Sequence, residues 1–154
     1  MKVAVGFDHA GVPLRETVIG TLGDEGHEVI DCGVEDDYPD VVLPVCRAVV
    51  EGTADRGLLV CGSGAGVAVA ATKIAGIRAQ TVDDTYTAHQ AVEHDDLNVL
   101  CLGARVVGPE LAADLIRAWA AARFTGEQRH RRRLAKVTLI ERDGLDADLR
   151  DVTG

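Results

Sequence analysis

The sequence predicts an α/β protein with a three-layer, Rossmann-like fold, in which helices flank a five-stranded parallel sheet. Short runs rich in Val, Ile and Leu alternate with longer helical segments, as in repeated βα units. No linker, low-complexity stretch or internal repeat interrupts this alternation. With 154 residues, the chain has the length of one domain. We therefore expect one domain over residues 1–142, followed by a polar tail at 143–154.

Each expected element follows from its local pattern. Pro13 and Pro109 suit the first turns of two helices. Pro44 should kink the second helix or delay its start, and Gly76 should cap the end of the third. The expected strands are 2–6, 27–33, 57–62, 77–82 and 98–103. The expected helices are 13–25, 39–50, 66–73, 85–93, 109–124 and 130–142.

Charge and composition exclude several classes of protein. The formal net charge of -9 argues against a nucleic-acid partner, because phosphate backbones repel an acidic surface. No apolar run approaches the ~20 residues of a membrane span. The N-terminus MKVAVGFDHAG does not resemble a signal peptide, so we expect a cytoplasmic protein. One segment, RHRRR at 129–133, reverses the acidic character; it is either an anion site, reaching a partner subunit, or a solvated basic helix start.

The four cysteines are far apart in the sequence, which favours reduced thiols over a disulfide framework. No CxxC pair occurs, so a zinc site is not expected. Cys46 and Cys101 fall on apolar faces and are interpreted as packing residues. Cys61 is different, because it ends an apolar run at the start of a glycine-rich loop.

In open parallel sheets, the ligand site lies beyond the carboxyl ends of the strands. The loops expected there are FDHAG (7–11), CGSGAG (61–66), DDTY (83–86) and GAR (103–105). His94 lies before the fifth strand rather than after it, so topology alone does not bring it to this edge.

The glycine loop after Cys61 matches neither of two phosphate-binding motifs. The GxxxxGK[ST] spacing of a P-loop is absent, and the loop lacks the GxGxxG spacing of a dinucleotide site. Unshielded N–H groups at a helix N-terminus can still bind a phosphate or an oxyanion that develops during reaction. The same partial positive charge would stabilise a thiolate at Cys61. The alternatives are a purely structural turn and a buried, packing cysteine.

Two polar residues, Asp8 and His9, end the first strand. Polar groups there cost free energy if they only pack, so they either belong to a site or anchor the loop by hydrogen bonds. His94 has neighbouring carboxylates that could orient its ring, or it is a structural residue. Asp8, His9 and His94 match no metal-ligand spacing, so no metal is expected.

The chain resembles the ribose-5-phosphate isomerase B family, which also includes galactose-6-phosphate isomerase subunits and allose-6-phosphate isomerase. The resemblance covers about residues 1–140. The motifs that carry it are FDHAG, DYPD, ADRGLLVCGSGAGVAVAATK, GIRA, DTYTA, EHDDLNVLCLGARVVGPELA and the RH..R pattern at 129–133.

The resemblance implies that the protein interconverts ribose 5-phosphate and ribulose 5-phosphate through a cis-enediolate, without metal or cofactor. It assigns proton transfer at carbon to Cys61, proton movement between O1 and O2 to Ser63, and ring opening to His94 with Asp8 nearby. It implies a homodimer with shared active sites, or a tetramer, in which the basic segment at 129–142 reaches the neighbouring subunit. The expected substrate-binding residues are His9, Tyr38, Gly62, Gly64, Ala65, Gly66, Val67, Tyr86, Asp95, Arg105, Arg129, His130 and Arg133. Of these, His9 and the four residues from Arg105 onward are expected at the phosphate.

The sequence departs from the family pattern at three positions, which affects the substrate preference that the resemblance implies. Ser63 replaces threonine, Asp95 replaces asparagine, and Thr72 replaces asparagine on the helix after the loop. None removes a catalytic group, but each could change the preferred sugar phosphate. The alternatives are therefore the same chemistry on an allose, galactose or tetrose phosphate, and a sugar-phosphate-binding module without turnover.

Overall fold

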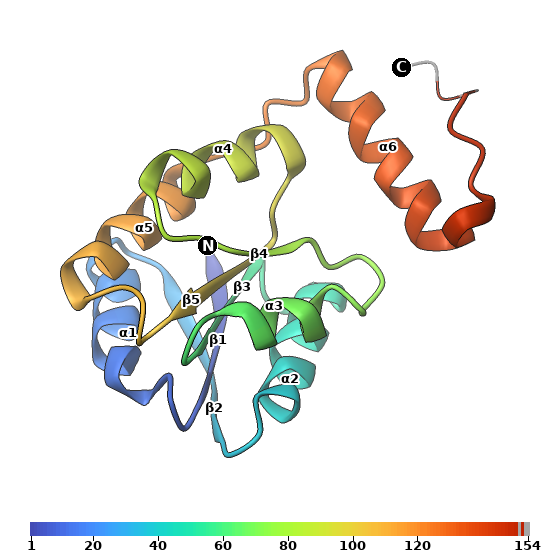
Figure 1. Cartoon of the computed structure of the whole chain (residues 1–154). Helices are drawn as coiled ribbons and strands as arrows, with labels where there is room; N and C mark the ends of the chain where they lie inside the picture. Colours follow the sequence, from blue (N-terminus) through green and yellow to red (C-terminus); the bar gives the residue numbers. More distant parts are fainter. Residues whose placement is uncertain (151, 153–154) are drawn as a thin grey trace.

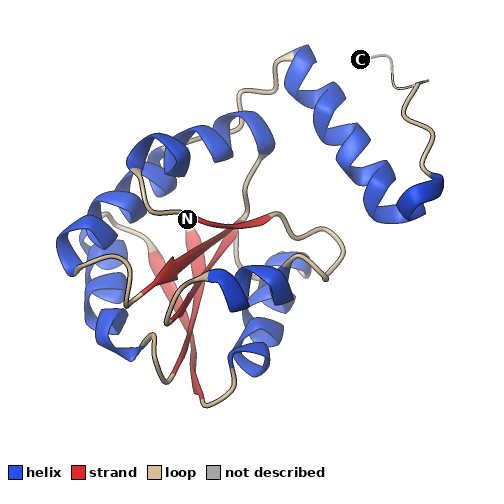
Figure 2. Cartoon of the chain, in the orientation of Figure 1, coloured by secondary structure: helices blue, strands red, loops and turns tan. Residues whose placement is uncertain are grey.

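The computed structural model describes residues 1–150 and 152 and contains one five-stranded sheet (Figures 1 and 2). All its strands are parallel, in the order β2-β1-β3-β5-β4. This confirms the predicted fold class. The strands are β1 (Lys2–Asp8), β2 (Glu28–Glu35), β3 (Arg56–Cys61), β4 (Ala79–Thr81) and β5 (Val99–Gly103).

Helices cover both faces of the sheet, which makes three layers (Figure 1). One face carries α1 (Arg15–Asp24), α4 (Thr85–Asp95) and α5 (Pro109–Ala121), and the other carries α2 (Tyr38–Val50) and α3 (Ala65–Ala71). Two short 3-10 helices, at Val12–Leu14 and Gly144–Asp146, complete the described elements. The last long helix, α6 (Gln128–Asp143), projects away from these layers beyond the end of α4 (Figure 1).

A hydrophobic core lies on each side of the sheet. Trp119 of α5 and Phe7 of β1 are fully buried on one side. Val41 and Val45 of α2 are fully buried on the other. Each large side chain buried in this way stabilises the fold by roughly 1.5–3 kcal/mol, so the sheet is a firm base for the loops at its edges.

The direction of the connections changes between β1 and β3, which are neighbours in the sheet. Chain connections lead from β1 outward to β2 on one side and from β3 outward on the other. Loops at such a switch point diverge and leave a crevice at the carboxyl ends of the strands. Because Phe7 pairs with Val60, the residues that follow, Asp8 and Cys61, enter this crevice side by side.

Two details of the predicted helices are wrong. Pro44 does not delay α2, which begins at Tyr38 and continues through it. Pro44 and Asp40 both face solvent, so water can replace the helical hydrogen bond that a proline cannot donate to the Asp40 carbonyl. Gly76 does not cap α3, which ends at Ala71.

Candidate active site

A pocket of about 350 Å³ opens at the carboxyl edge of the sheet, between the ends of β1 and β3. It is the predicted position for a ligand in a fold of this kind. Its lining residues are Asp8, His9, Ala10, Tyr38, Cys61, Gly62, Ser63, Gly66, Arg105 and Val106. All of them except Ala10 and Val106 were expected at the site from the sequence.

Cys61 is the last residue of β3 and is 4% exposed. Its Sγ accepts a hydrogen bond from the backbone N–H of Gly64 over 3.1 Å. This contact holds the sulfur at the start of the glycine loop, and a thiolate is the form of a cysteine that can take a proton from carbon. The other buried thiols are in different surroundings: burial raises the pKa of Cys46 to about 11 and raises that of Cys101 further.

The glycine loop places backbone donors next to this sulfur. Gly64 has φ 80°, a left-handed conformation that turns the chain sharply into α3. The Ala65 N–H donates to Ser63 Oγ over 3.3 Å. For the N–H groups of Gly66 and Val67, no acceptor occurs among the residues that the structure describes. These two donors can bind an oxyanion.

Asp8 and His9 are held by the loops around the crevice. The Asp8 carboxylate is 6% exposed and accepts a hydrogen bond from the Gly11 N–H at 2.8 Å. His9 Nδ1 lies 2.9 Å from the carbonyl oxygen of Asp36, and since a carbonyl can only accept, Nδ1 carries the proton. His9 Nε2 can then donate to a phosphate only when the ring takes up a second proton.

Tyr38 and Arg105 border the pocket on either side of the glycine loop. A Cβ added to Gly66 would lie 3.2 Å from the Tyr38 ring, so glycine lets this ring approach the loop. Arg105 lies beside Gly62, 3.5 Å from where a Cβ would stand, and its N–H binds the Gly62 carbonyl. Its exposed guanidinium has no ion-pair partner in the described part of the chain, which leaves a cation available for an anionic ligand.

Five predicted site residues lie elsewhere in the subunit. His94 is in the last turn of α4, before β5 begins, and so lies at the amino edge of the sheet. The five residues of β5 separate the two edges by about 13 Å at ~3.3 Å per residue. Asp95, Arg129, His130 and Arg133 accompany His94 at the amino edge or on α6, and none of the five lines the pocket that contains Cys61. The expected proximity of His94 and Asp8 is therefore not found within one subunit.

Tyr86 lies at the carboxyl edge of the sheet but outside the pocket. It is in the first turn of α4, is 71% exposed and does not line the pocket. Its hydroxyl accepts a hydrogen bond from Gln90 Nε2. Tyr86 is therefore free to contact a ligand or a partner that covers this edge.

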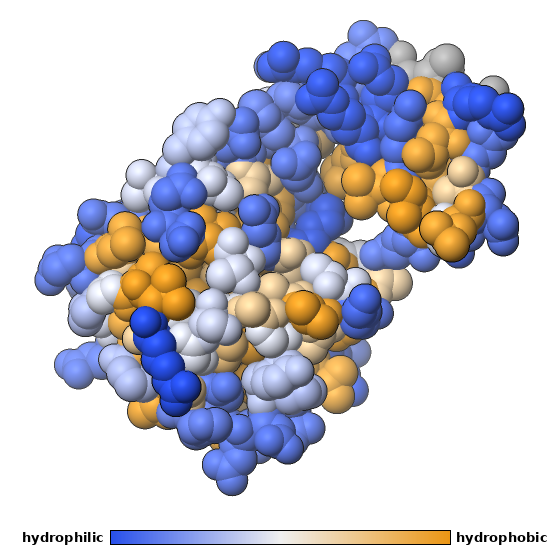
Figure 3. Space-filling view, in the orientation of Figure 1, coloured by the Kyte–Doolittle hydropathy of each residue, from blue (hydrophilic) through white to orange (hydrophobic). Residues whose placement is uncertain are grey.

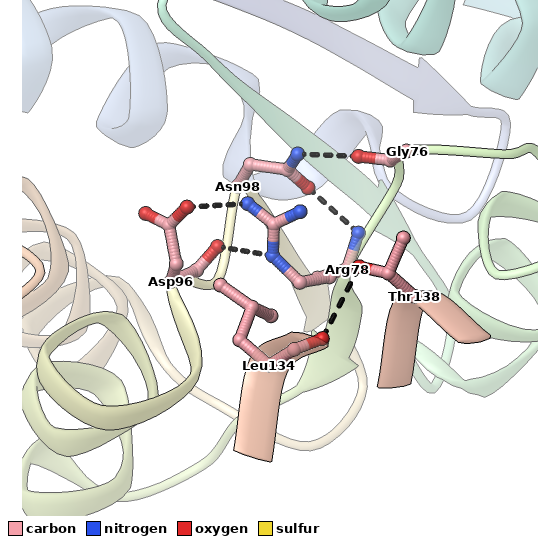
Figure 4. Close-up of polar contacts among 6 residues, drawn as sticks. All are labelled: Gly76, Arg78, Asp96, Asn98, Leu134 and Thr138. Atoms are coloured by element: carbon pink, nitrogen blue, oxygen red, sulfur yellow. Dashed lines mark hydrogen bonds and ion pairs between the residues drawn. The ribbon is translucent and has the colours of Figure 1, made fainter. Parts of the chain in front are cut away.

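A network of hydrogen bonds holds the turn that follows His94 (Figure 4). Arg78 donates from Nε to the Asp96 carbonyl and from Nη2 to its carboxylate, over 2.7 and 2.6 Å. Asn98 binds the Arg78 N–H and the Gly76 carbonyl. Asp96 is left-handed, with φ 52°, a conformation in which Asp costs more than Gly. The ion pair with Arg78 explains why this position carries an aspartate rather than a glycine.

The larger hollow of the molecule, about 690 Å³, lies between α6 and the edge of the sheet near β4. Figure 3 shows hydrophobic side chains gathered over α6 beside this hollow. Thr72 and Asp95, two of the departures noted above, line it. The smaller pocket is lined by Cys61 and by Gly66, one of the residues with a free N–H group, so it is the candidate active site despite its size.

Ala10 and Val106 line the pocket without having been predicted. Their side chains carry no reactive group, so their positions in the FDHAG and GARVVG segments are the only signal that could have identified them. Among the described residues, no cluster of three or more His, Cys, Asp or Glu could hold a metal ion. No described helix is long and apolar enough to span a membrane.

Comparisons with known proteins agree with this fold. The model of the Ribose/Galactose Isomerase family matches residues 3–137. The chain belongs to the ribose-5-phosphate isomerase B family. Ribose-5-phosphate isomerase B of Escherichia coli is 42% identical over 144 residues, which cover 91% of this chain and 96% of that protein. A structure of the Clostridium thermocellum ribose-5-phosphate isomerase B has 43% identity and a TM-score of 0.88, and the match covers 92% of this chain and 98% of that one.

Family membership makes the protein a sugar-phosphate isomerase, an enzyme that interconverts an aldose and a ketose. The family includes more than one named activity. The D-erythrulose-4-phosphate isomerase of Pectobacterium atrosepticum is 40% identical, and the match covers 82% of this chain and 86% of that protein. Its sequence identity to this chain is close to that of the Escherichia coli relative, so sequence similarity does not show which sugar phosphate is the substrate.

Proposed function

We propose that this isomerase interconverts ribose 5-phosphate and ribulose 5-phosphate through a cis-enediolate, with Cys61 as the base. The observation that supports this most directly is the Cys61 sulfur in the pocket, which accepts a hydrogen bond from Gly64. The free N–H groups of Gly66 and Val67 lie in the first turn of α3, the helix that follows this loop. A base and two oxyanion donors are the parts that an enediolate mechanism requires.

The steps follow from the positions of these groups. The Cys61 thiolate removes the proton from C2 of the open-chain aldose, and the electron pair forms the C1–C2 double bond while charge develops on O1. The loop N–H groups stabilise that charge, with a contribution of about 3–4 kcal/mol from each well-placed donor. Ser63 Oγ moves a proton between O1 and O2, and the Cys61 thiol returns its proton to C1, which gives the ketose.

Binding of the phosphate requires cations that one subunit supplies only in part. His9 and Arg105 border the pocket, while Arg129 and Arg133 lie on α6, which projects from the body (Figure 1). We propose a homodimer in which the amino edge of one subunit covers the carboxyl edge of the other. His94 and the arginines of α6 would then complete the partner's pocket, and Tyr38 and Tyr86 would contact the sugar.

Exposed hydrophobic side chains support such a dimer. Val106 on the pocket rim is 58% exposed, and Ile140 of α6 is 50% exposed. Exposed apolar side chains on the pocket rim and on α6 are expected if these two surfaces are covered by a second subunit. A two-fold axis would form two equivalent sites.

The alternative substrate is a tetrose phosphate, because a named D-erythrulose-4-phosphate isomerase is nearly as similar as the named ribose-5-phosphate isomerase. The two sugars make different demands. Ribose 5-phosphate closes to a furanose and needs ring opening, but a 4-phosphorylated tetrose has no free hydroxyl that can close a five-membered ring. Replacement His94→Asn should therefore reduce kcat/KM for ribose 5-phosphate more than for erythrose 4-phosphate, if both are substrates.

Carbon NMR of a mixture of the enzyme with ribose 5-phosphate in D2O tests the proposal. We expect ribulose 5-phosphate to form, with deuterium at C1 from solvent exchange of the proton held by Cys61. Absence of ribulose 5-phosphate at every enzyme concentration would refute the substrate, and deuterium at C1 would distinguish the enediolate from a hydride shift, which carries no solvent hydrogen to carbon. Ligand binding with no turnover would instead support a binding module. The same assay with tetrose and hexose phosphates ranks the substrates by kcat/KM.

A further inference from the structure

His130 is the buried residue of α6. The helix is described throughout, and His130, at 1% exposed, is its one buried member. Its ring stacks on that of His94, with centroids 4.1 Å apart and planes tilted by 34°. The family resemblance assigns His130 to the phosphate, but a buried ring in contact with another histidine has a different set of neighbours from a phosphate ligand.

Hydrogen bonds through Thr125 determine which nitrogen of His130 carries its proton. The Thr125 hydroxyl lies 2.8 Å from His130 Nδ1 and 3.1 Å from the Glu93 carbonyl. A carbonyl cannot donate, so the single hydroxyl proton goes to Glu93 and Nδ1 donates its own proton to the hydroxyl. The reverse tautomer would leave a buried N–H at Nε2 without an acceptor, which is the costlier arrangement.

The remaining nitrogen, Nε2, is buried and has no hydrogen-bond partner among the described residues. In the tautomer just derived, it is an unprotonated acceptor and cannot donate to a phosphate. A second proton there is opposed by the surroundings of the ring. Burial lowers the pKa of His130, and the neighbouring charges of His94, Arg129 and Arg133 lower it further, while Glu127 acts in the opposite direction.

The same contacts lead back to the residue beside His94. Both the N–H and the hydroxyl of Thr125 bind the Glu93 carbonyl, so the segment that leads into α6 is tied to the last turn of α4. In the described part of the chain, no hydrogen bond orients the ring of His94 itself. Its stacking on His130 is therefore the contact that fixes the ring.

We propose that His130 is a positioning residue: a neutral ring, held by Thr125, against which His94 is oriented for ring opening in the partner's pocket. It is not a ligand of the substrate phosphate. The inference rests on the proposed role of His94. Within the basic segment, Arg129 and Arg133 would bind the phosphate, whereas His130 would not.

Two substitutions distinguish a platform from a phosphate ligand. His130→Phe keeps an aromatic surface but removes both nitrogens, and His130→Ala removes the surface as well. We expect the inhibition constant of inorganic phosphate to stay within about twofold of wild type in both. We expect kcat for ribose 5-phosphate to fall roughly tenfold in His130→Ala and by less than about threefold in His130→Phe. Arg133→Gln is the positive control and should raise the phosphate inhibition constant.

NMR of the histidine rings tests the structural part without any need for turnover. In wild type, the ring nitrogens of His130 should show a protonated Nδ1 and a bare Nε2. The ring protons of His94 should carry an upfield ring-current shift that persists in His130→Phe and disappears in His130→Ala. If the wild type proves inactive on every sugar phosphate, the proposed function fails, while these spectra still decide the tautomer and the stacking.

The results that would overturn the proposal are equally specific. A roughly tenfold rise in the phosphate inhibition constant of His130→Phe would make His130 a ligand. Unchanged kcat in His130→Ala, or a protonated Nε2 in the wild-type spectrum, would remove the positioning role. If His130→Ala does not fold, Thr125→Val replaces it. This variant preserves shape, removes the hydroxyl contacts with His130 and Glu93 but keeps the backbone N–H bond to Glu93, and should reduce kcat without changing phosphate inhibition.

Discussion

The backbone N–H of Gly64 donates to the Sγ of Cys61 over 3.1 Å. This contact joins the end of β3 to the turn that begins α3, so one loop holds both the proposed base and the proposed oxyanion donors. Because Gly64 adopts φ 80°, its N–H turns back toward the preceding strand. The sulfur is thereby held in the lining of the pocket, at the position that the proposed mechanism requires of the base.

Replacement of Cys61 by alanine should separate catalysis from binding. We expect kcat to fall by at least ~100-fold, because general base catalysis contributes that much or more, while inorganic phosphate binds nearly as before. Steady-state kinetics and phosphate inhibition measure the two effects. Cys32→Ser, on β2 and outside the pocket, is the control and should keep nearly full activity. Equal loss in both variants would remove Cys61 from the chemistry.

Alkylation offers a second test of the cysteine. At pH 8, burial keeps the thiols of Cys46 and Cys101 protonated, since it raises the pKa of Cys46 to about 11 and that of Cys101 further. We expect iodoacetamide to inactivate the enzyme by modification of Cys61, and bound phosphate to slow the reaction. Mass spectrometry identifies the modified residue. Inactivation that tracks modification of Cys46 or Cys101 would contradict this account.

Substitution Gly64→Ala should reduce both stability and activity. The left-handed backbone costs about 1–2 kcal/mol for a residue with a Cβ, and this Cβ would lie 2.6 Å from Thr81 Cγ2 and 3.1 Å from the Leu102 carbonyl carbon. Gly76→Ala is the matched control, because Gly76 has φ 82° with nothing within 4 Å. Urea unfolding should show a larger loss for Gly64→Ala. Equal losses, with activity kept in both, would show that the loop tolerates the clash.

Substitution Arg78→Met should loosen the turn that follows His94. It removes two hydrogen bonds to Asp96 and leaves a left-handed aspartate without its partner, so we expect a loss of about 1–2 kcal/mol in the free energy of unfolding. Arg117→Met is the control: its ion pairs with Glu25 and Asp114 are exposed and should contribute little. A loss no larger than that of the control would contradict the role of Arg78.

The N-cap of α4 should make stability depend on acid pH. Asp84 accepts a hydrogen bond from the Thr87 N–H at 2.7 Å, and hydrogen bonds from Thr87 lower the pKa of this carboxyl. Because the pKa of Asp84 is lower in the folded state than in the unfolded state, the ionised cap stabilises the fold at pH values above the unfolded-state pKa. This stabilisation is lost as the pH falls through the folded-state pKa. Asp84→Ala should therefore lower Tm at neutral pH, with a difference from wild type that shrinks on acidification. A constant difference across the titration would exclude the cap as its cause.

The sequence was sufficient to predict the sheet and most of the residues that line the pocket at its carboxyl edge. Parallel strands end at a common edge, so Asp8 at the end of β1 and Cys61 at the end of β3 had to meet, and the register of Phe7 with Val60 confirms it. The glycine turn was predictable for the same reason. Pro44 was harder to judge, because its effect on α2 depends on whether the affected carbonyl faces solvent.

The part of the proposed site that includes His94 could not be predicted from chain order. His94 precedes β5, which places it at the amino edge, and in the proposed dimer a second subunit brings that edge to Cys61. The environment of His130 was also unpredictable, because its burial depends on how α6 leaves the body and on the hydrogen bond to Thr125. Motif position alone does not distinguish a ring that binds phosphate from one that supports another ring.

The central claim is that two subunits share each site, and complementation between inactive variants tests it most directly. Cys61→Ala and His94→Asn are purified separately, mixed in equal amounts, and allowed to exchange subunits, with heterodimers counted by native mass spectrometry. In a two-fold symmetric dimer, half of the random pairs are mixed and each restores one intact site, so the mixture should recover about a quarter of wild-type activity. Heterodimers that form without any recovery of activity would contradict the shared site.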